Sequence, residues 1–129
     1  MTRAEPQPLP HTLDAPRLAR RYVTSRTAAW PAELVEITML LTSELVTNAV
    51  VHGLGPVQLL LVEEGDRLRV EVTDAEPRLP DGPGKPADHD ESGRGLLILD
   101  RLADRWGSHP CPTPPGKVVW FEVRHRPSG

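Results

Sequence analysis

The fold is decided by residues 43–53, which read SELVTNAVVHG. Together with the residues before them, they place apolar side chains at helical spacing: Leu34, Ile37, Leu41, Leu45 and Ala49. On a helix that turns by about 100° per residue, Glu44 and Asn48 share the side of these leucines, so both polar side chains are expected to look inward. Burying a charge without a partner costs roughly several kcal/mol. A metal ion with a polyanionic ligand would meet that charge, and a hydrogen-bonded structural pair is the alternative.

Length and composition set the class of protein. A chain of 129 residues is expected to form one domain with a real core. Its 15 basic and 18 acidic residues give a net charge of −3, with no basic stripe that would indicate direct nucleic-acid binding. The single cysteine, Cys111, excludes an intrachain disulfide and fits a reducing compartment. Because we find neither a signal-peptide run nor the ~20 apolar residues of a membrane span, we expect a cytoplasmic protein without membrane contact.

The segments before and within the central helix follow from their own patterns. Residues 1–11 are rich in proline and predict a flexible tail, although a short strand before the first helix stays open. Residues 14–29 predict a first helix with a proline near its start. The central helix is expected over residues 31–52, and Gly53 is expected to end it.

A β-hairpin is expected next in the chain. Val57–Glu63 and Arg67–Thr73 are rich in strand-forming residues and are separated by the short turn Gly65-Asp66. The second strand alternates apolar and polar side chains, and Asp74 continues the apolar phase. A carboxylate is therefore expected at the end of this strand, on the face that meets the helices.

The second half of the chain contains one long loop. Residues 75–92 are rich in proline, glycine and acidic side chains, which is typical of a lid, a binding segment or disorder. Gly93-Arg94-Gly95 then leads into a helix, and a last strand is expected over Lys117–His125 after a proline-rich connection, residues 110–116. A further strand near residues 106–109 stays open.

This order of elements predicts an α/β fold. Residues 12–129 are expected to form a single domain, a two-layer α/β sandwich with a mixed, mostly antiparallel sheet and its helices on one face. The central helix, the strand end at Asp74 and the helix start at Gly93 would then share one side of the sheet.

The chemistry of these three elements fits a phosphorylated nucleotide. Glycines at a helix start let backbone N–H groups approach an anion, and Arg94 can bind a phosphate with two hydrogen bonds. Asn48 offers an oxygen that suits Mg²⁺, and Glu44 can orient or deprotonate an attacking hydroxyl. Asp74 can accept a hydrogen bond from a purine amino group. Each feature alone is common, since glycines precede many helices and an Asp at a strand end is usually a turn residue.

Four stretches resemble a known family. Residues 43–49 with His52-Gly53 are similar to the N box of the nucleotide-binding fold shared by gyrase, Hsp90-type chaperones, histidine kinases and MutL proteins, known as the Bergerat or GHKL fold. Residues 72–74 match its adenine-binding Asp box, and residues 92–99 match the glycine box after the ATP lid. Residues 116–121 resemble the closing strand. The chain resembles most closely the small anti-sigma-factor serine-kinase-like ATP-binding regulators.

The resemblance assigns ATP and Mg²⁺ as cofactors and gives each matching residue a role. Asn48 would bind Mg²⁺, Glu44 would activate the acceptor hydroxyl as the catalytic residue, and Asp74 would read the adenine amino group. The glycine box would meet the phosphates through residues that also include an arginine and a leucine: Gly93, Arg94, Gly95 and Leu96.

The expected activity is transfer of the γ-phosphate to a Ser or Thr of a small antagonist protein, in the regulation of transcription. A sigma factor, an anti-sigma factor antagonist or both would be partners, and a homodimer is open. The alternative is a non-enzymatic module that binds a partner, with the nucleotide structural or absent. One departure concerns Glu76-Pro77, because the broader fold usually has a glycine in place of Glu76.

Overall fold

The computed structural model describes residues 2–3, 6–77, 91–112 and 115–125, with only the backbone of residues 2–3, 91–96 and 112. The described helices are α1 (Ala15–Arg26), α2 (Ala32–His52) and α3 (Glu91–Leu102). The described strands are β1 (Thr2–Arg3), β2 (Gln7–Leu9), β3 (Val57–Glu64), β4 (Arg67–Asp74), β5 (Arg105–Pro112) and β6 (Pro115–Arg124).

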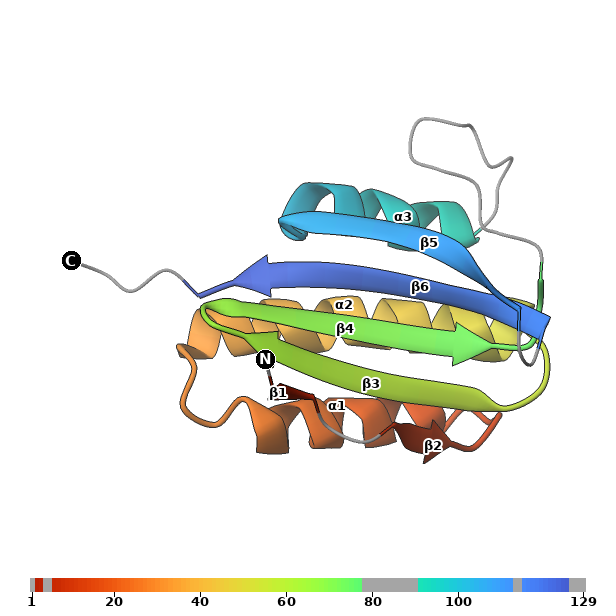
Figure 1. The fold of residues 1–129 in the computed structure, drawn as a ribbon, viewed down its shortest axis with the longest axis horizontal. Helices are drawn as coiled ribbons and strands as arrows, with labels where there is room; N and C mark the ends of the chain where they lie inside the picture. Colours follow the sequence, from red (N-terminus) through yellow and green to blue (C-terminus); the bar gives the residue numbers. More distant parts are fainter. Residues whose placement is uncertain (1, 4–5, 78–90, 113–114, 126–129) are drawn as a thin grey trace.

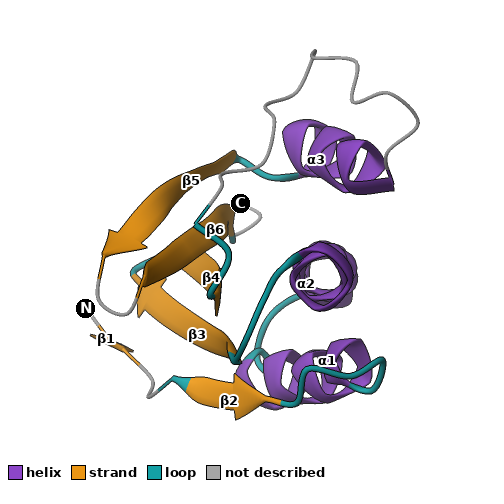
Figure 2. Ribbon diagram, turned by 90° about the vertical axis from the view of Figure 1, so that its right-hand side faces the viewer, coloured by secondary structure: helices purple, strands orange, loops and turns teal. Residues whose placement is uncertain are grey.

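The strands form one sheet with the order β1-β3-β4-β6-β5, and β2 pairs with the same edge of β3 as β1 does. Every described strand pair is antiparallel, so the expectation of a mixed sheet is wrong for the described strands. Figures 1 and 2 show the three helices on one face of this sheet, so the expected two-layer α/β sandwich is confirmed. The hairpin of β3 and β4 also has the expected two-residue turn, with Gly65 at a φ of 63°.

The N-terminal segment differs from the prediction of a flexible tail. Residues 7–9 pair with β3 in the register Gln7↔Leu59 to Leu9↔Val57, and residues 2–3 pair further along the same edge. The edge of β3 offers unpaired N–H and C=O groups, and an edge strand is the place in a sheet that tolerates proline. The strand left open before the first helix is therefore present.

The C-terminal hairpin also corrects one expectation. Residues 110–116 were expected to be a connection, but the described part of this segment belongs to β5 and β6, with the partners Pro110↔Lys117 and Cys111↔Gly116. The strand expected near residues 106–109 is confirmed as part of β5. Because β5 lies at the edge of the sheet, its prolines remove no ladder bond from an inner pair.

Helix α2 is the centre of the helical layer (Figure 2). It packs against α1, α3 and the sheet, and its buried side chains are Thr38, Leu41, Thr42, Leu45, Val46 and Ala49. Over 18 residues its mean hydropathy is 1.5, so by length and composition alone it could span a membrane, contrary to the expectation that no segment reaches that composition. Leu41, Leu45, Val46 and Ala49 of this helix belong to the buried core, and 33% of the 18-residue window is buried.

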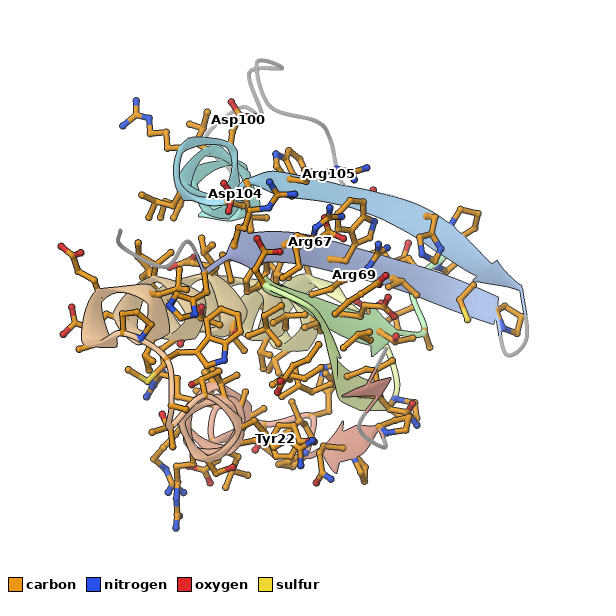
Figure 3. The ribbon with its side chains drawn as sticks, turned by 60° about the vertical axis from the view of Figure 1, so that its left-hand side comes forward. Tyr22, Arg67, Arg69, Asp100, Asp104 and Arg105 are labelled. Carbon is orange, nitrogen blue, oxygen red and sulfur yellow. The ribbon has the colours of Figure 1, made fainter. Side chains whose placement is uncertain are left out.

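The sheet face away from the helices is closed by its own side chains. The Arg69 guanidinium lies 4.0 Å from the ring centroid of Trp120, and it forms ion pairs with Glu71 at 3.0 Å and Glu122 at 3.4 Å. Figure 3 shows Arg67, Arg69 and Arg105 gathered on the strands. Stacked arginine and tryptophan side chains cover apolar surface while keeping the charge paired, so this face needs no helix over it.

Glycines allow the strand end at Asp74 to lie close to its neighbours. A Cβ on Gly53 would lie 2.7 Å from the Asp74 carboxyl carbon, and a Cβ on Gly116 would lie 3.0 Å from the Ala75 Cα and closer still to the Asp74 carbonyl oxygen. Gly53 has an extended φ of −89°, so the need for glycine there comes from space rather than from backbone conformation. The polypeptide around Asp74 is therefore packed at backbone distance on two sides.

We predict that Gly116→Ala lowers the free energy of unfolding by about 3 kcal/mol, because the methyl group would strike the backbone of β4. Gly65→Ala is the matched control. It meets no neighbour and should cost only the strain of a positive φ, about 1–2 kcal/mol. Urea denaturation with similar m values measures both. Equal losses for the two variants would contradict the close packing at Gly116.

Candidate functional site

Three chain segments meet at one end of the sheet. Figure 1 shows that α2 ends, β4 ends and α3 begins at the same end of the molecule. The contact between the first two is direct, since the backbone N–H of Ala75 donates to the Leu54 carbonyl at 2.7 Å. The ends of α2 and β4 are therefore in contact, and the start of α3 lies at the same end of the molecule.

Asp74 is the buried last residue of β4 at this end of the sheet. Its side chain is only 3% exposed, on the helix-facing side of the sheet, where the strand alternation places it. The Lys117 ammonium donates to its Oδ1 atom at 3.0 Å, and the Glu76 backbone N–H donates to the same atom at 2.7 Å. The carboxylate is thus a paired, charged acceptor at the end of β4 rather than a turn residue exposed to water.

The other oxygen of this carboxylate faces the end of α2. Both hydrogen bonds that Asp74 accepts from described residues fall on Oδ1, whereas Oδ2 would lie 2.7 Å from a Cβ at Gly53. A residue with a side chain in place of Gly53 would cover this oxygen. The glycine therefore keeps Oδ2 able to accept one more hydrogen bond, which suits an amino group of a ligand.

Glu44 and Asn48 lie on the flank of α2, and not in its buried centre. Both are half-buried, in contrast to Leu41 and Leu45. With about 100° of turn per residue, Asn48 lies about 90° and Glu44 about 130° from the centre of the buried face. The expectation that both look inward is therefore wrong: both side chains are half-buried and lie away from the centre of the buried face. The reason is that the buried face is centred on Thr38, Thr42 and Ala49, and the leucines lie toward one side of it.

The positions along α2 give these residues an order. At about 1.5 Å of rise per residue, Asn48 lies about 7.5 Å and Glu44 about 13.5 Å along the axis from Gly53. Because Gly53 lies against the Asp74 carboxylate, the polar side chains follow one another away from that carboxylate. Asp74, Asn48 and Glu44 thus form a row that runs from the end of α2 back toward the middle of the helix.

The glycine segment differs from the prediction in one detail. Helix α3 begins at Glu91, so Gly93, Arg94 and Gly95 lie in its first turns and do not precede it. The first N–H groups of an α-helix have no partner within the helix, and those of Glu91, Ser92 and Gly93 are among them. The backbone can therefore still offer donors to an anion. The side chains of Arg94 and Leu96 lie outside the described part, as do residues 78–90 of the expected lid.

A metal site made by the protein alone is absent from the described residues. No three His, Cys, Asp or Glu side chains gather there within reach of one ion. Asn48 has a side-chain oxygen on the flank of α2.

Comparison with known proteins identifies the family. Residues 9–123 match the family described as the histidine kinase-like ATPase domain. The chain belongs to this family. It is 44% identical over 70 residues to the uncharacterized protein SCO4941 of Streptomyces coelicolor, a match that covers 50% of the chain and 66% of that protein, just under two thirds of its length.

Two solved structures share the fold. The structure of the RsbU and RsbW domains of Rv1364c from Mycobacterium tuberculosis superposes with a TM-score of 0.71 at 20% identity, over 97% of this chain and 34% of that one. The histidine kinase domain of the blue-light activated histidine kinase EL346 from Erythrobacter litoralis gives 0.55 at 25% identity, over 74% and 46%. The histidine kinase-like ATPase domain implies ATP as the ligand, and the chain spans less than half of either solved chain.

Lys117 is the residue of this ATPase domain that the sequence patterns did not identify. The strand alternation gives a signal for it, because Lys117 precedes the buried residues Val119 and Phe121 at the same two-residue spacing. Asp74 extends the inward face of β4 in the same way, and the antiparallel register makes Asp74 and Lys117 direct partners. Two inward charges of opposite sign at facing strand ends indicate an ion pair.

We predict that Lys117→Met lowers the free energy of unfolding by about 3–5 kcal/mol, because it leaves a buried carboxylate without its counter-charge. The double variant Asp74→Asn/Lys117→Met removes both charges and should recover much of this loss. Chemical denaturation of the two variants and the wild type measures the difference. If the double variant is no more stable than Lys117→Met, the ion pair does not determine this energy.

Proposed function

We propose that this chain is a cytoplasmic protein serine/threonine kinase of the anti-sigma-factor type, which binds ATP with Mg²⁺ and phosphorylates a small antagonist protein. The observation that carries the proposal is the row formed by Asp74, Asn48 and Glu44 along the end of α2. Its order matches a nucleotide whose base, phosphates and phosphate acceptor follow one another in the same direction. Membership of the family supports ATP as the ligand, and the row leaves Glu44 as the residue beside the acceptor hydroxyl.

The proposed reaction uses the two ends of this row differently. Asp74 accepts a hydrogen bond from the adenine amino group and fixes the base. At the other end, the oxygen of an acceptor Ser or Thr attacks the γ-phosphorus, the bond to the bridging oxygen of ADP breaks, and the hydroxyl proton passes to the Glu44 carboxylate. A half-buried carboxylate suits this step, because the hydroxyl of a second protein must reach it.

The phosphates need positive charge and donors around them. Asn48 would hold Mg²⁺, which neutralises charge on the phosphate oxygens when it is bound. The first backbone N–H groups of α3 would meet the phosphates, aided by the partial positive charge of the helix start. Gly93 and Gly95 would permit close approach, and Arg94 and Leu96 belong to the same proposed segment.

The partner is proposed from the fold of a relative. The Rv1364c structure contains a domain named RsbW, and its superposition on this chain supports a regulator of the anti-sigma type. We propose an anti-sigma factor antagonist as the phosphate acceptor, a sigma factor as a second partner, and a homodimer as the form that binds them. Regulation of transcription would then proceed through protein contacts, without direct contact to nucleic acid or to a membrane.

A second candidate, a partner-binding module without catalysis, is favoured by a basic hollow between α1 and α2. The hollow has a volume of about 480 Å³ and is lined by Arg17, Arg20, Arg21, Thr24, Ser25 and Met39. Arg20 donates to the Ser43 hydroxyl at 3.1 Å, which ties the hollow to the residue before Glu44. An acidic partner could bind there whether or not phosphate is transferred.

We predict that titration calorimetry with ATP and Mg²⁺ detects binding to the wild type, and that Asn48→Ala or Asp74→Asn weakens it at least tenfold. Loss of a hydrogen bond to a charged group is worth about 1.5–3 kcal/mol, which is about 10- to 150-fold in affinity. Gln58→Ala, an exposed position on β3, is the control and should bind as the wild type does. Absence of heat for the wild type at millimolar ATP would remove the core of the proposal.

The kinase and binding-module proposals diverge at Glu44. We predict that Glu44→Gln keeps the affinity for ATP but lowers phosphotransfer to a recovered acceptor protein by about 10²–10⁴-fold, since a general base acts mainly in the transition state. The amide has nearly the shape of the acid, so the flank of α2 stays packed. If the wild type transfers no phosphate and Glu44→Gln still binds the partner, the binding-module proposal stands and the kinase proposal fails.

A further inference from the structure

We propose that Lys117 positions the Asp74 carboxylate for the nucleobase and thereby sets the selectivity of the site for a purine with a 6-amino group. This inference rests on the proposed binding of ATP at Asp74. Lys117 donates its hydrogen bond to Asp74 and not to the nucleotide. Its proposed role is therefore indirect.

The hydrogen bonds of Asp74 are divided between its two oxygens. Oδ1 accepts from the Lys117 ammonium at 3.0 Å and from the Glu76 backbone N–H at 2.7 Å. Two donors on one oxygen fix the rotation of the carboxylate about its own axis. Oδ2 is then directed toward Gly53, where the missing side chain leaves it able to accept from a ligand. The lysine thus determines which carboxylate oxygen of Asp74 can accept from the ligand, and in which plane the carboxylate lies.

The lysine itself is held by the sheet. Lys117 and Asp74 are direct partners in the antiparallel ladder of β4 and β6, and the exposed fractions of their side chains are 11% and 3%. Gly116, next to Lys117, packs against the backbone of Asp74 and Ala75. The ion pair therefore joins two rigid strands, and a donor of this kind holds its acceptor more tightly than a donor on a loop would.

The Glu76-Pro77 departure fits this arrangement. A glycine is usual at the position of Glu76 in the broader fold, yet the backbone N–H of Glu76 still reaches the carboxylate. Only the N–H is needed for the bond to Oδ1, so the residue type at this position leaves the geometry of Asp74 intact. Selectivity is then expected to depend on Lys117.

The opposite role would be competition, in which the lysine occupies Asp74 and the base must displace it. The two roles differ in sign. A positioning lysine makes binding of ATP tighter and more selective, so its removal weakens ATP binding and reduces discrimination. A competing lysine does the reverse, so its removal tightens ATP binding.

The test compares ATP, GTP and purine riboside triphosphate, which lacks the 6-amino group, by titration calorimetry in the presence of Mg²⁺. For the wild type we expect ATP to bind about 10- to 100-fold more tightly than the deamino analogue, the range of one hydrogen bond to a charged acceptor. Lys117→Met should reduce this ratio to within about threefold and should weaken ATP. Lys117→Arg keeps a cation on Oδ1 and should keep most of the ratio.

Controls separate this role from a structural one and from failure of the proposed function. Circular dichroism at the temperature of the titrations shows whether Lys117→Met is folded; if it is not, Lys117→Arg and Lys117→Gln carry the comparison, and Gln is expected to lose the ratio. Gln58→Ala, at an exposed position on β3, should keep the wild-type ratio. If the wild type binds no ATP, the proposed function fails. If the wild type discriminates and a folded Lys117→Met or Lys117→Gln discriminates equally, or binds ATP more tightly, the positioning role is overturned.

Discussion

The ion pair between Asp74 and Lys117 is the constraint on which the site depends. Two opposite charges are removed from water at the ends of adjacent strands, where the loss of hydration must be offset by close geometry and additional hydrogen bonds. The Glu76 backbone supplies one such bond. Because the pair requires the register of β4 and β6, a shift of either strand by one residue would turn one charge to the opposite face and leave the other unpaired.

The surrounding fold brings α2 and α3 to this charged strand end. Helix α2 is fixed by its own buried face, and its last turn meets β4 where Gly53 has no side chain. The flank of the same helix carries Asn48 and Glu44 away from Asp74. In the proposed function, the purine acceptor Asp74, the metal ligand Asn48 and the general base Glu44 follow one another along α2. The sequence of α2 thus determines both how the helix packs and where Asn48 and Glu44 lie.

Much of this arrangement could be predicted from local sequence. The periodicity of residues 31–52 gave α2, and the alternation in β4 placed Asp74 on the inward face. Both patterns depend on a residue's immediate neighbours along the chain. The N-terminal strands could not be read in this way, because their prolines indicate a tail unless the free edge of β3 is known. Strand pairing is a property of two segments, and neither segment alone contains it.

The polar residues show the same limit. Glu44 and Asn48 were expected inward because they share the side of the leucines, but the buried face of α2 is centred on Thr38, Thr42 and Ala49. Which face of a helix is central depends on what packs against it. Lys117 was missed for a related reason: its inward phase is visible in β6, but its partner lies 43 residues away. The family match identifies the fold, and the roles of these side chains are proposals that the geometry supports.

The most direct measurement is a crystal structure of the protein with Mg²⁺ and a non-hydrolysable ATP analogue. The account predicts that the adenine 6-amino nitrogen lies within hydrogen-bond distance of Asp74 Oδ2, while Lys117 stays on Oδ1 and the phosphates lie toward Asn48 and the start of α3. A base bound away from Asp74, or a Lys117 ammonium displaced from Oδ1 by the nucleotide, would contradict it.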